Sequence, residues 1–207
     1  MKTMLKEAGI LFAITLIAGL LLGVVHEVTA EPIKKAEEEA KMKAWNEVFS
    51  DAASFDENEE GFGVSSAALS EKVKEAGFKA DIEAVVRALD NAGNTLGYVI
   101  TVNDHEGYGG DIRFSMGIRS DGTLNGISIL EISETAGLGM KADPVLTSQL
   151  KDIKVDNISF VKGGGGNPSQ GTIDAISGAT ITTTAVTNGV NAGLTAFFEI
   201  TKGGVGA

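Results

Sequence analysis

The feature that most limits the fold of this chain is an uncharged apolar run at residues 8–25, preceded by Lys2 and Lys6. The run is about as long as a helix needs to cross a bilayer, and longer than most signal-peptide cores. We therefore predict a cytoplasmic tip and retained transmembrane anchor at residues 1–30, with cleavage after residues 28–30 as the alternative. Because positive residues favour the cytoplasmic side, the rest of the chain is predicted to be extracytoplasmic.

The composition argues against several kinds of chemistry. The chain has no cysteine, which rules out disulfides, iron–sulfur clusters, c-type haem and thioether-linked flavin. Its two histidines, His26 and His105, are predicted to be surface residues, and no metal site is expected. The net charge of −11 argues against nucleic acid as a partner. No catalytic residues are predicted, because two histidines without a cysteine offer no catalytic triad or Cys–His pair.

The rest of the chain is predicted to form one α+β domain at residues 61–207, an antiparallel sheet with packed helices. Residues 31–60 are predicted to hold a juxtamembrane helix, from Pro32 to about Ser50, and an acidic loop at residues 56–60. Hydrophobic spacing and turn residues predict the other elements: helices at residues 66–76 and 143–150, strands at 98–102, 112–118, 124–132 and 158–161, and a glycine loop at 163–168. Residues 82–89 fit helix or strand, but the loop at 90–94 favours an antiparallel hairpin with residues 98–102.

The most informative local pattern is residues 174–182, where a turn of small and hydroxyl residues meets an apolar helix. A helix is predicted over residues 181–200 from the spacing of Val186, Val190, Leu194 and Phe197. Its N-terminus then lies at Thr180, where unpaired N–H groups and the helix dipole favour a phosphate. Gly178 and Ala179 leave the backbone open to that anion. The alternative is that Ser177 or Thr180 only caps the helix.

The sequence Ser-Gly-Ala-Thr at residues 177–180, with Asp174 three residues before it, resembles the flavinylation motif of the FMN-binding domain family. In that family the last threonine carries FMN through a phosphodiester bond. The resemblance implies that Thr180 is the covalent attachment point and that Thr182 belongs to the same cofactor site. It also implies that a flavin transferase reads the segment, formed here by Asp174, Ser177, Gly178 and Ala179.

Two further elements extend the resemblance along the chain. Residues 107–112 resemble the family's Gly-Tyr-Gly-Gly-x-Ile element, and residues 134–139 resemble its Glu-Thr-Pro-Gly-Leu-Gly loop, with Ala136 in place of the proline. The three elements occur in the family's order. The resemblance implies flavin contacts from Tyr108, Gly109, Glu134, Thr135, Gly137, Leu138 and Gly139. The alternative is that these are ordinary turn residues.

Small anchored members of this family resemble the G subunit of the Rnf complex, which passes electrons between ferredoxin and NAD and couples them to ion movement. The resemblance implies an electron-transfer subunit with covalent FMN, whose partners are other membrane subunits and, during maturation, a flavin transferase. Three alternatives remain open. They are the C subunit of a sodium-pumping NADH:quinone reductase, a stand-alone extracytoplasmic FMN electron carrier, and a non-redox assembly module.

Overall fold

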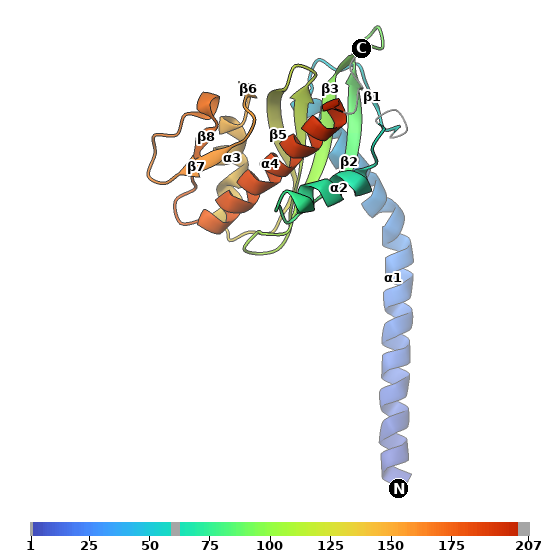
Figure 1. Cartoon of the computed structure of the whole chain (residues 1–207). Coiled ribbons are helices and arrows are strands. Elements are labelled where there is room, and N and C mark those ends of the chain that lie inside the picture. The colour runs from blue at the N-terminus through green and yellow to red at the C-terminus, as the bar shows by residue number, and fades with distance from the viewer. Residues whose placement is uncertain (1, 59–62, 203–207) are drawn as a thin grey trace. The chain divides into compact units, whose positions relative to one another are not determined.

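The computed structural model describes residues 2–58 and 63–202, and the chain divides into two units, Met1–Ala40 and Lys41–Ala207 (Figure 1). Two residues of the predicted acidic loop, 59 and 60, lie outside the described residues. The predicted boundaries at residues 31 and 61 stay predictions. The second unit contains the sheet and all three of the sequence elements that resemble the FMN-binding family.

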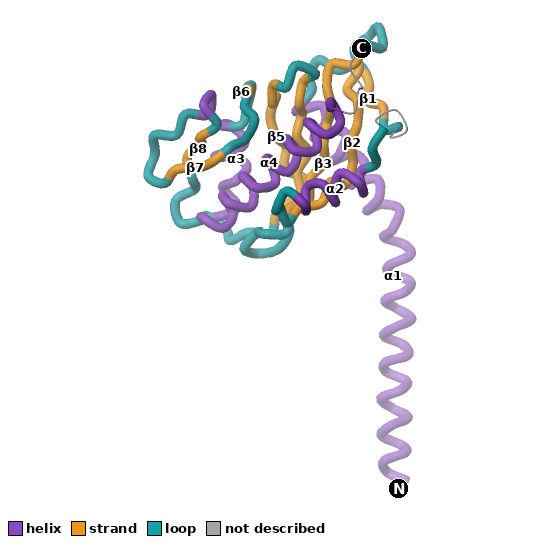
Figure 2. Tube along the Cα trace, in the orientation of Figure 1, coloured by secondary structure: helices purple, strands orange, loops and turns teal. Residues whose placement is uncertain are grey.

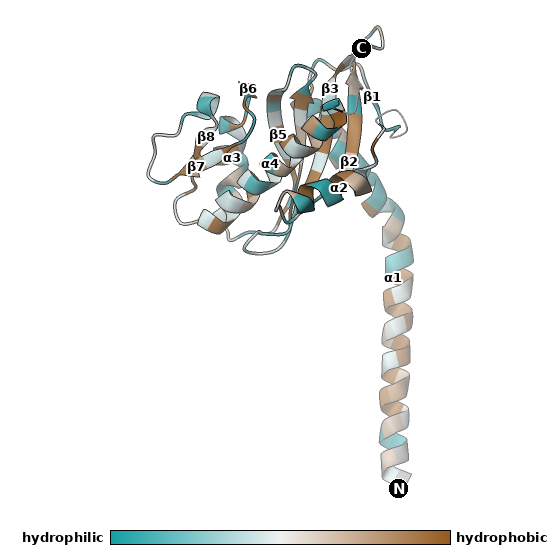
Figure 3. Cartoon of the chain, viewed as in Figure 1, coloured by the Kyte–Doolittle hydropathy of each residue, from teal (hydrophilic) through white to brown (hydrophobic). Residues whose placement is uncertain are grey.

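Helix α1 (Lys2–Val48) runs without interruption through the predicted anchor and the predicted juxtamembrane helix. The expected start of a new helix at Pro32 is wrong, because the proline lies inside α1. A proline there removes one backbone hydrogen bond without necessarily ending the helix. One window of 18 residues has a mean hydropathy of 2.6 and no buried residue, so α1 is long and apolar enough to cross a membrane (Figure 3).

The second unit is built on a six-stranded antiparallel sheet whose spatial order follows the sequence (Figure 2). Its strands are β1 (Ser54–Asp56), β2 (Ala80–Leu89), β3 (Thr95–Asp104), β4 (Ile112–Arg119), β5 (Thr123–Ile132) and β6 (Ile153–Lys154). The predicted hairpin of residues 82–89 and 98–102 is confirmed as β2 and β3. The predicted hairpin around residues 120–123 is confirmed as β4 and β5.

Two separate cores cover the faces of this sheet. Helices α2 (Ser66–Glu75) and α4 (Thr180–Lys202) pack on one face, where Val85 contributes to the larger core. Residues 45–49, at the end of α1 and just beyond it, pack on the other face with Val86. Adjacent strand residues serve different cores because successive side chains in a strand point to opposite faces.

A small parallel sheet lies directly before α4 in the chain. Strand β7 (Ser159–Val161), which the sequence predicted, pairs with β8 (Thr172–Asp174), which it did not. The segment before β7 contains α3 (Ala142–Leu146) and short 3-10 helices at Gly139–Lys141 and Thr147–Gln149, while a third lies at Pro168–Gln170. Because β8 ends at Asp174, the turn that follows is anchored at one end by a strand and at the other by α4.

Candidate flavin site

The turn between β8 and α4 is held by its own backbone. The Ala179 N–H donates to the Ile176 carbonyl at 3.0 Å, and the Thr183 hydroxyl accepts from the Ile176 N–H at 3.1 Å. Gly178 has a φ of +79°, which a residue with a side chain adopts only with strain. Helix α4 then begins at Thr180, so the predicted start of this helix is confirmed.

The hydroxyl of Thr180 is not used by the fold. Within residues 2–58 and 63–202, neither Ser177 nor Thr180 accepts a capping hydrogen bond from an N–H group of α4. The same described part of the chain supplies no acceptor for the N–H groups of Thr180, Ile181 and Thr182. Ser177 is exposed and Thr180 is half-buried. The start of α4 therefore presents three N–H donors and an unengaged hydroxyl.

A cavity of about 550 Å³ opens at this helix start and brings the three sequence elements together. It is lined by Tyr108, Glu134, Thr135, Leu138, Gly139, Gly178, Ala179, Thr180, Ile181 and Thr182. Four residues predicted for the site or for transferase recognition do not line it: Gly109, Gly137, Asp174 and Ser177. The sequence prediction missed Ile181. The available signal was its place directly after Thr180 at the predicted helix start, and in the structure it is half-exposed.

Glu134 connects the three elements through one carboxylate. Its Oε1 accepts hydrogen bonds from the N–H groups of Tyr108 at 2.7 Å and Gly109 at 3.3 Å. Its Oε2 accepts from the Thr182 hydroxyl at 3.0 Å. One side chain thus ties the loop before β4 to the loop after β5 and to the first turn of α4.

Close approach to this carboxylate requires residues without a side chain. A Cβ atom on Gly139 would lie 2.7 Å from Glu134 Oε2 and 2.6 Å from Thr182 Oγ1. A Cβ atom on Gly109 would lie 1.9 Å from the carbonyl oxygen of Ser133. Both separations are far below normal contact distances, so these two glycines allow the loops to close around Glu134.

Asp174 supports the turn from outside the cavity. Its Oδ1 accepts from the Gly166 N–H at 2.8 Å, which fixes the end of the glycine loop. Its backbone N–H donates to the Gln149 side chain at 2.7 Å, and the Gln149 amide donates back to the Asp174 carbonyl at 3.1 Å. Asp174 therefore has a structural contact of its own, in addition to the recognition role predicted for it.

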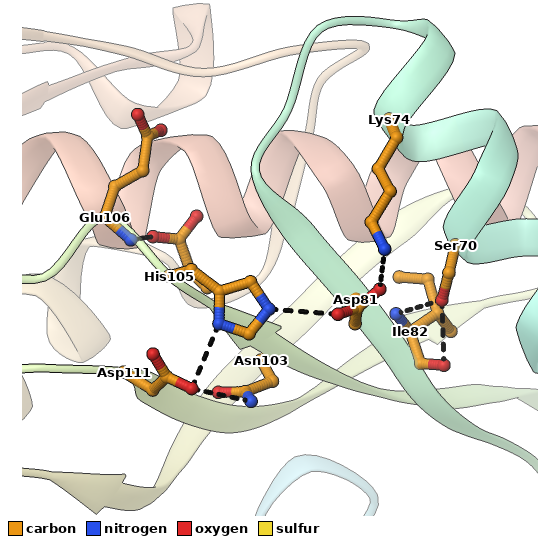
Figure 4. A network of polar contacts seen from close by, with 9 residues as sticks. Ser70, Lys74, Asp81, Ile82, Asn103, His105, Glu106 and Asp111 are labelled. Atoms are coloured by element: carbon orange, nitrogen blue, oxygen red, sulfur yellow. Dashed lines mark hydrogen bonds and ion pairs between the residues drawn. The ribbon is translucent and has the colours of Figure 1, made fainter.

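A second polar network lies on the outer side of the loop between β3 and β4 (Figure 4). The His105 ring contacts Asp81 through Nε2 and Asp111 through Nδ1, each at 3.0 Å. Hydrogen bonds to Asp81 and then Asp111 raise the pKa of His105 above its usual value. The Lys74 ammonium and His105 lower the pKa of Asp81. The described residues contain no group of three or more His, Asp and Glu side chains arranged to hold a metal ion.

Asp104 lies beside this network but is buried. Its Oδ1 accepts from the Glu106 N–H at 2.8 Å, whereas its Oδ2 has no hydrogen-bond partner among the described residues. Burial raises the pKa of Asp104 to about 6. A carboxylate without full hydrogen bonding is costly inside a protein, which explains the direction of the shift.

Comparison with known proteins identifies the family. The sequence profile of the FMN-binding domain matches residues 107–195, and that of the RnfG N-terminal region matches residues 1–48. The chain is 30% identical to the G subunit of the Na(+)-translocating ferredoxin:NAD(+) oxidoreductase complex of Acetobacterium woodii, over 97% of this chain and 95% of that one. It is also 30% identical to the G subunit of the ion-translocating oxidoreductase complex of Methanosarcina acetivorans, over 92% of both chains. The chain belongs to the RnfG family, the G subunits of ion-translocating oxidoreductase complexes.

The solved structures agree on the fold. The crystal structure of the C subunit of the Na(+)-translocating NADH-quinone reductase from Parabacteroides distasonis matches with a TM-score of 0.51 and 23% identity, over 72% of this chain and 77% of that one. The predicted α+β class and the predicted family are both confirmed. The match at residues 1–48 and the exposed apolar helix together indicate membrane anchoring.

The cavity fits the cofactor that the family implies. Every residue lining it lies within the matched FMN-binding domain. Its volume of about 550 Å³ is within the usual range for sites that hold small molecules. One end offers the N–H donors of a helix start for a phosphate, and the walls offer Tyr108 and Leu138 as partly exposed apolar surface for a ring.

Proposed function

We propose that this chain is the membrane-anchored flavoprotein subunit of an ion-translocating ferredoxin:NAD oxidoreductase and relays electrons through FMN bound covalently to Thr180. One observation carries the proposal. The unengaged Thr180 hydroxyl lies at the N-terminus of α4, the positive end of the helix dipole. It also lies on the wall of a cavity to which all three family elements contribute. The 30% identity to a G subunit over 97% of the chain favours this function over that of a C subunit, whose structures support the fold alone.

The start of α4 suits a phosphodiester. In the proposed maturation, a transferase supplies a flavin dinucleotide, and the Thr180 oxygen attacks the phosphorus that bears the flavin. The hydroxyl proton leaves to a base of the transferase, the phosphoanhydride bond breaks, and AMP departs. The product keeps one negative charge. The N–H groups of Thr180, Ile181 and Thr182 stabilise an anion there.

The cavity walls would hold the ring and leave one edge accessible. Tyr108, Leu138 and Ile181 supply partly exposed apolar surface, and Thr135 and Gly139 also line the cavity. When bound, FMN supplies the redox chemistry, while this chain binds and orients it. Electrons must then come from and go to other subunits of the complex.

The proposed orientation puts this site outside the cytoplasm, because Lys2 and Lys6 precede the apolar segment of α1. Protease added to intact spheroplasts should digest the flavin domain. Protection in spheroplasts, with digestion only after lysis, would reverse the orientation. A mature N-terminus at Glu31 would show instead that the anchor is cleaved.

The covalent bond is tested by producing the full chain with and without a flavin transferase. Wild-type protein should fluoresce in a denaturing gel only with the transferase, and the peptide containing Thr180 should gain the mass of FMN less one water. Thr180→Val should abolish both signals. Thr184→Val is the matched control, since Thr184 lies one turn further along α4 and donates only to the Thr180 carbonyl, at 2.9 Å. Fluorescence that persists in Thr180→Val would overturn the assignment.

The relay role is tested in membranes that contain the whole complex. Thr180→Val should stop electron flow from ferredoxin to NAD while the complex still assembles. Normal electron flow would contradict the relay. Failure of assembly would favour the assembly-module alternative.

Transferase recognition is tested at Asp174. Asp174→Asn keeps an acceptor for the Gly166 N–H, whereas Asp174→Ala removes it. If the charge is read by the transferase, both variants should lose flavinylation. If only Asp174→Ala loses it, the structural contact with the glycine loop is the reason.

A further inference from the structure

The Glu134 carboxylate is buried at the cavity wall and is surrounded by donors. Its residue is only 9% exposed, and both oxygens accept hydrogen bonds, from two backbone N–H groups and from the Thr182 hydroxyl. An ionised carboxylate only accepts hydrogen bonds, so this arrangement suits the charged form.

No Lys, Arg or His within residues 2–58 and 63–202 forms an ion pair with Glu134. A buried charge without a counter-ion is costly to the fold, and the three hydrogen bonds offset that cost. A neutral acceptor could have joined the same loops at lower cost. The charge itself therefore calls for an explanation beyond the joining of three loops.

We propose that Glu134 is a positioning residue with an electrostatic role, which locks the cavity walls together and holds a negative charge that keeps the reduction potential of the bound flavin low. This inference rests on the proposed function, because it places FMN in the cavity. Full reduction of the ring takes two electrons from partner subunits and, near neutral pH, one proton from solvent. The ring thus gains a net negative charge, which a buried anion in the cavity wall disfavours.

The test uses full-length protein that carries FMN. Glu134→Gln removes the charge but keeps the side-chain length and an acceptor for the N–H groups of Tyr108 and Gly109. Glu131→Gln is the matched control, because Glu131 lies on the neighbouring strand β5 with its side chain 68% exposed. There, solvent screens the charge.

Midpoint potentials are read from flavin absorbance during a reductive titration. At a fixed ambient potential, Glu134→Gln should increase the ratio of reduced to oxidised flavin at least about tenfold, which is about 30 mV for a two-electron couple. Glu131→Gln should change the ratio less than about twofold. Equal shifts in the two variants, or a lower potential in Glu134→Gln, would overturn the electrostatic role.

Glu134→Asp separates the effect of the charge from the effect of the hydrogen bonds that hold the cavity walls together. The shorter side chain keeps the charge near the cavity but withdraws it from its donors. The potential should then stay close to that of wild type, while amide hydrogen exchange at Tyr108 and Gly109 should become faster. If the potential rises as far in Glu134→Asp as in Glu134→Gln, hydrogen bonding rather than charge sets it, and the electrostatic role is overturned.

Hydrogen exchange also gives a reading without the cofactor. In protein made without the transferase, Glu134→Ala should speed exchange at Tyr108 and Gly109, and Glu131→Ala should not. If hydrogen exchange at these amides is unchanged in Glu134→Ala, Glu134 does not hold the cavity walls together. This result counts even if Glu134→Ala or Glu134→Gln cannot be flavinylated. Absence of FMN from the wild-type protein would instead overturn the proposed function, so the two failures are distinguishable.

Discussion

The loop between β3 and β4 is held on its two sides by networks of opposite character. On the cavity side, the buried Glu134 carboxylate binds backbone N–H groups, and glycines allow the chains to meet at close range. On the outer side, His105 bridges Asp81 and Asp111 through side chains that are partly exposed to solvent (Figure 4). The first network combines a buried charge with close packing, and the packing tolerates little change. The second depends on charge and should respond to pH and salt.

The largest effect is expected from added bulk on the cavity side. In Gly109→Ala, the new Cβ would lie 1.9 Å from the Ser133 carbonyl oxygen, so the loop must move away from Glu134. We expect a loss of about 3 kcal/mol in the free energy of unfolding and little flavin incorporation. Urea unfolding of the detergent-solubilised chain and gel fluorescence measure the two effects.

Gly137→Ala is the control for that variant. Gly137 has a φ of +77° but nothing within 4 Å of an added Cβ, so the cost is backbone strain alone, about 1 kcal/mol. A similar loss in both variants would mean that the two chains need not meet closely at Gly109.

The elements that were predicted correctly carry their signal locally. Helix α4 shows apolar residues at helical spacing, and the β4–β5 hairpin has turn residues between two apolar strands. The strands β1, β6 and β8 were missed because two or three residues are too few to show alternation. The chain forms them by pairing with partners that lie far away in the sequence.

The residues of the candidate site also differ in whether the sequence carried a local signal for them. The resemblance identified its residues, and the dipole argument located the helix start at Thr180. The role of Glu134 was not predictable, because Tyr108 lies 26 residues before it and Thr182 lies 48 residues after it. Only the folded chain shows that a glutamate from a polar loop is buried and joins the three elements.

A second, smaller effect is expected from Asp104, the buried carboxyl group beside the His105 network. Its pKa of about 6 in the fold exceeds the unfolded value, so the folded state holds the proton more tightly. Between about pH 4.5 and about pH 7.5, stability should therefore fall by about 2 kcal/mol. Asp104→Asn should remove this dependence, as measured by urea unfolding at about pH 4.5 and about pH 7.5, on either side of most of the titration.

Asp121→Asn provides a control of opposite sign. Hydrogen bonds from Thr123 lower the pKa of Asp121, so its contribution to stability is present above its unfolded pKa and lost in acid. Removing it should slightly reduce stability at the higher pH. A wild-type protein that gains stability between the two pH values, unaffected by Asp104→Asn, would contradict the role of Asp104.

The smallest effect is expected on the outer side, from His105→Gln. Asp81 and Asp111 raise the pKa of His105, so its contribution is fully present below the unfolded pKa of about 6.5 and is lost as the pH rises through the raised value. The variant should be less stable than wild type at about pH 5.5 by at most about 1 kcal/mol, because these groups are partly exposed to solvent. The difference should shrink at about pH 9, and also at the lower pH in high salt, where counter-ions screen the pairs. Thermal unfolding of both proteins under these three conditions measures it. An equal loss at both pH values would show that His105 acts through shape, as Glu134 does in part, and the contrast between the two sides of the loop would no longer hold.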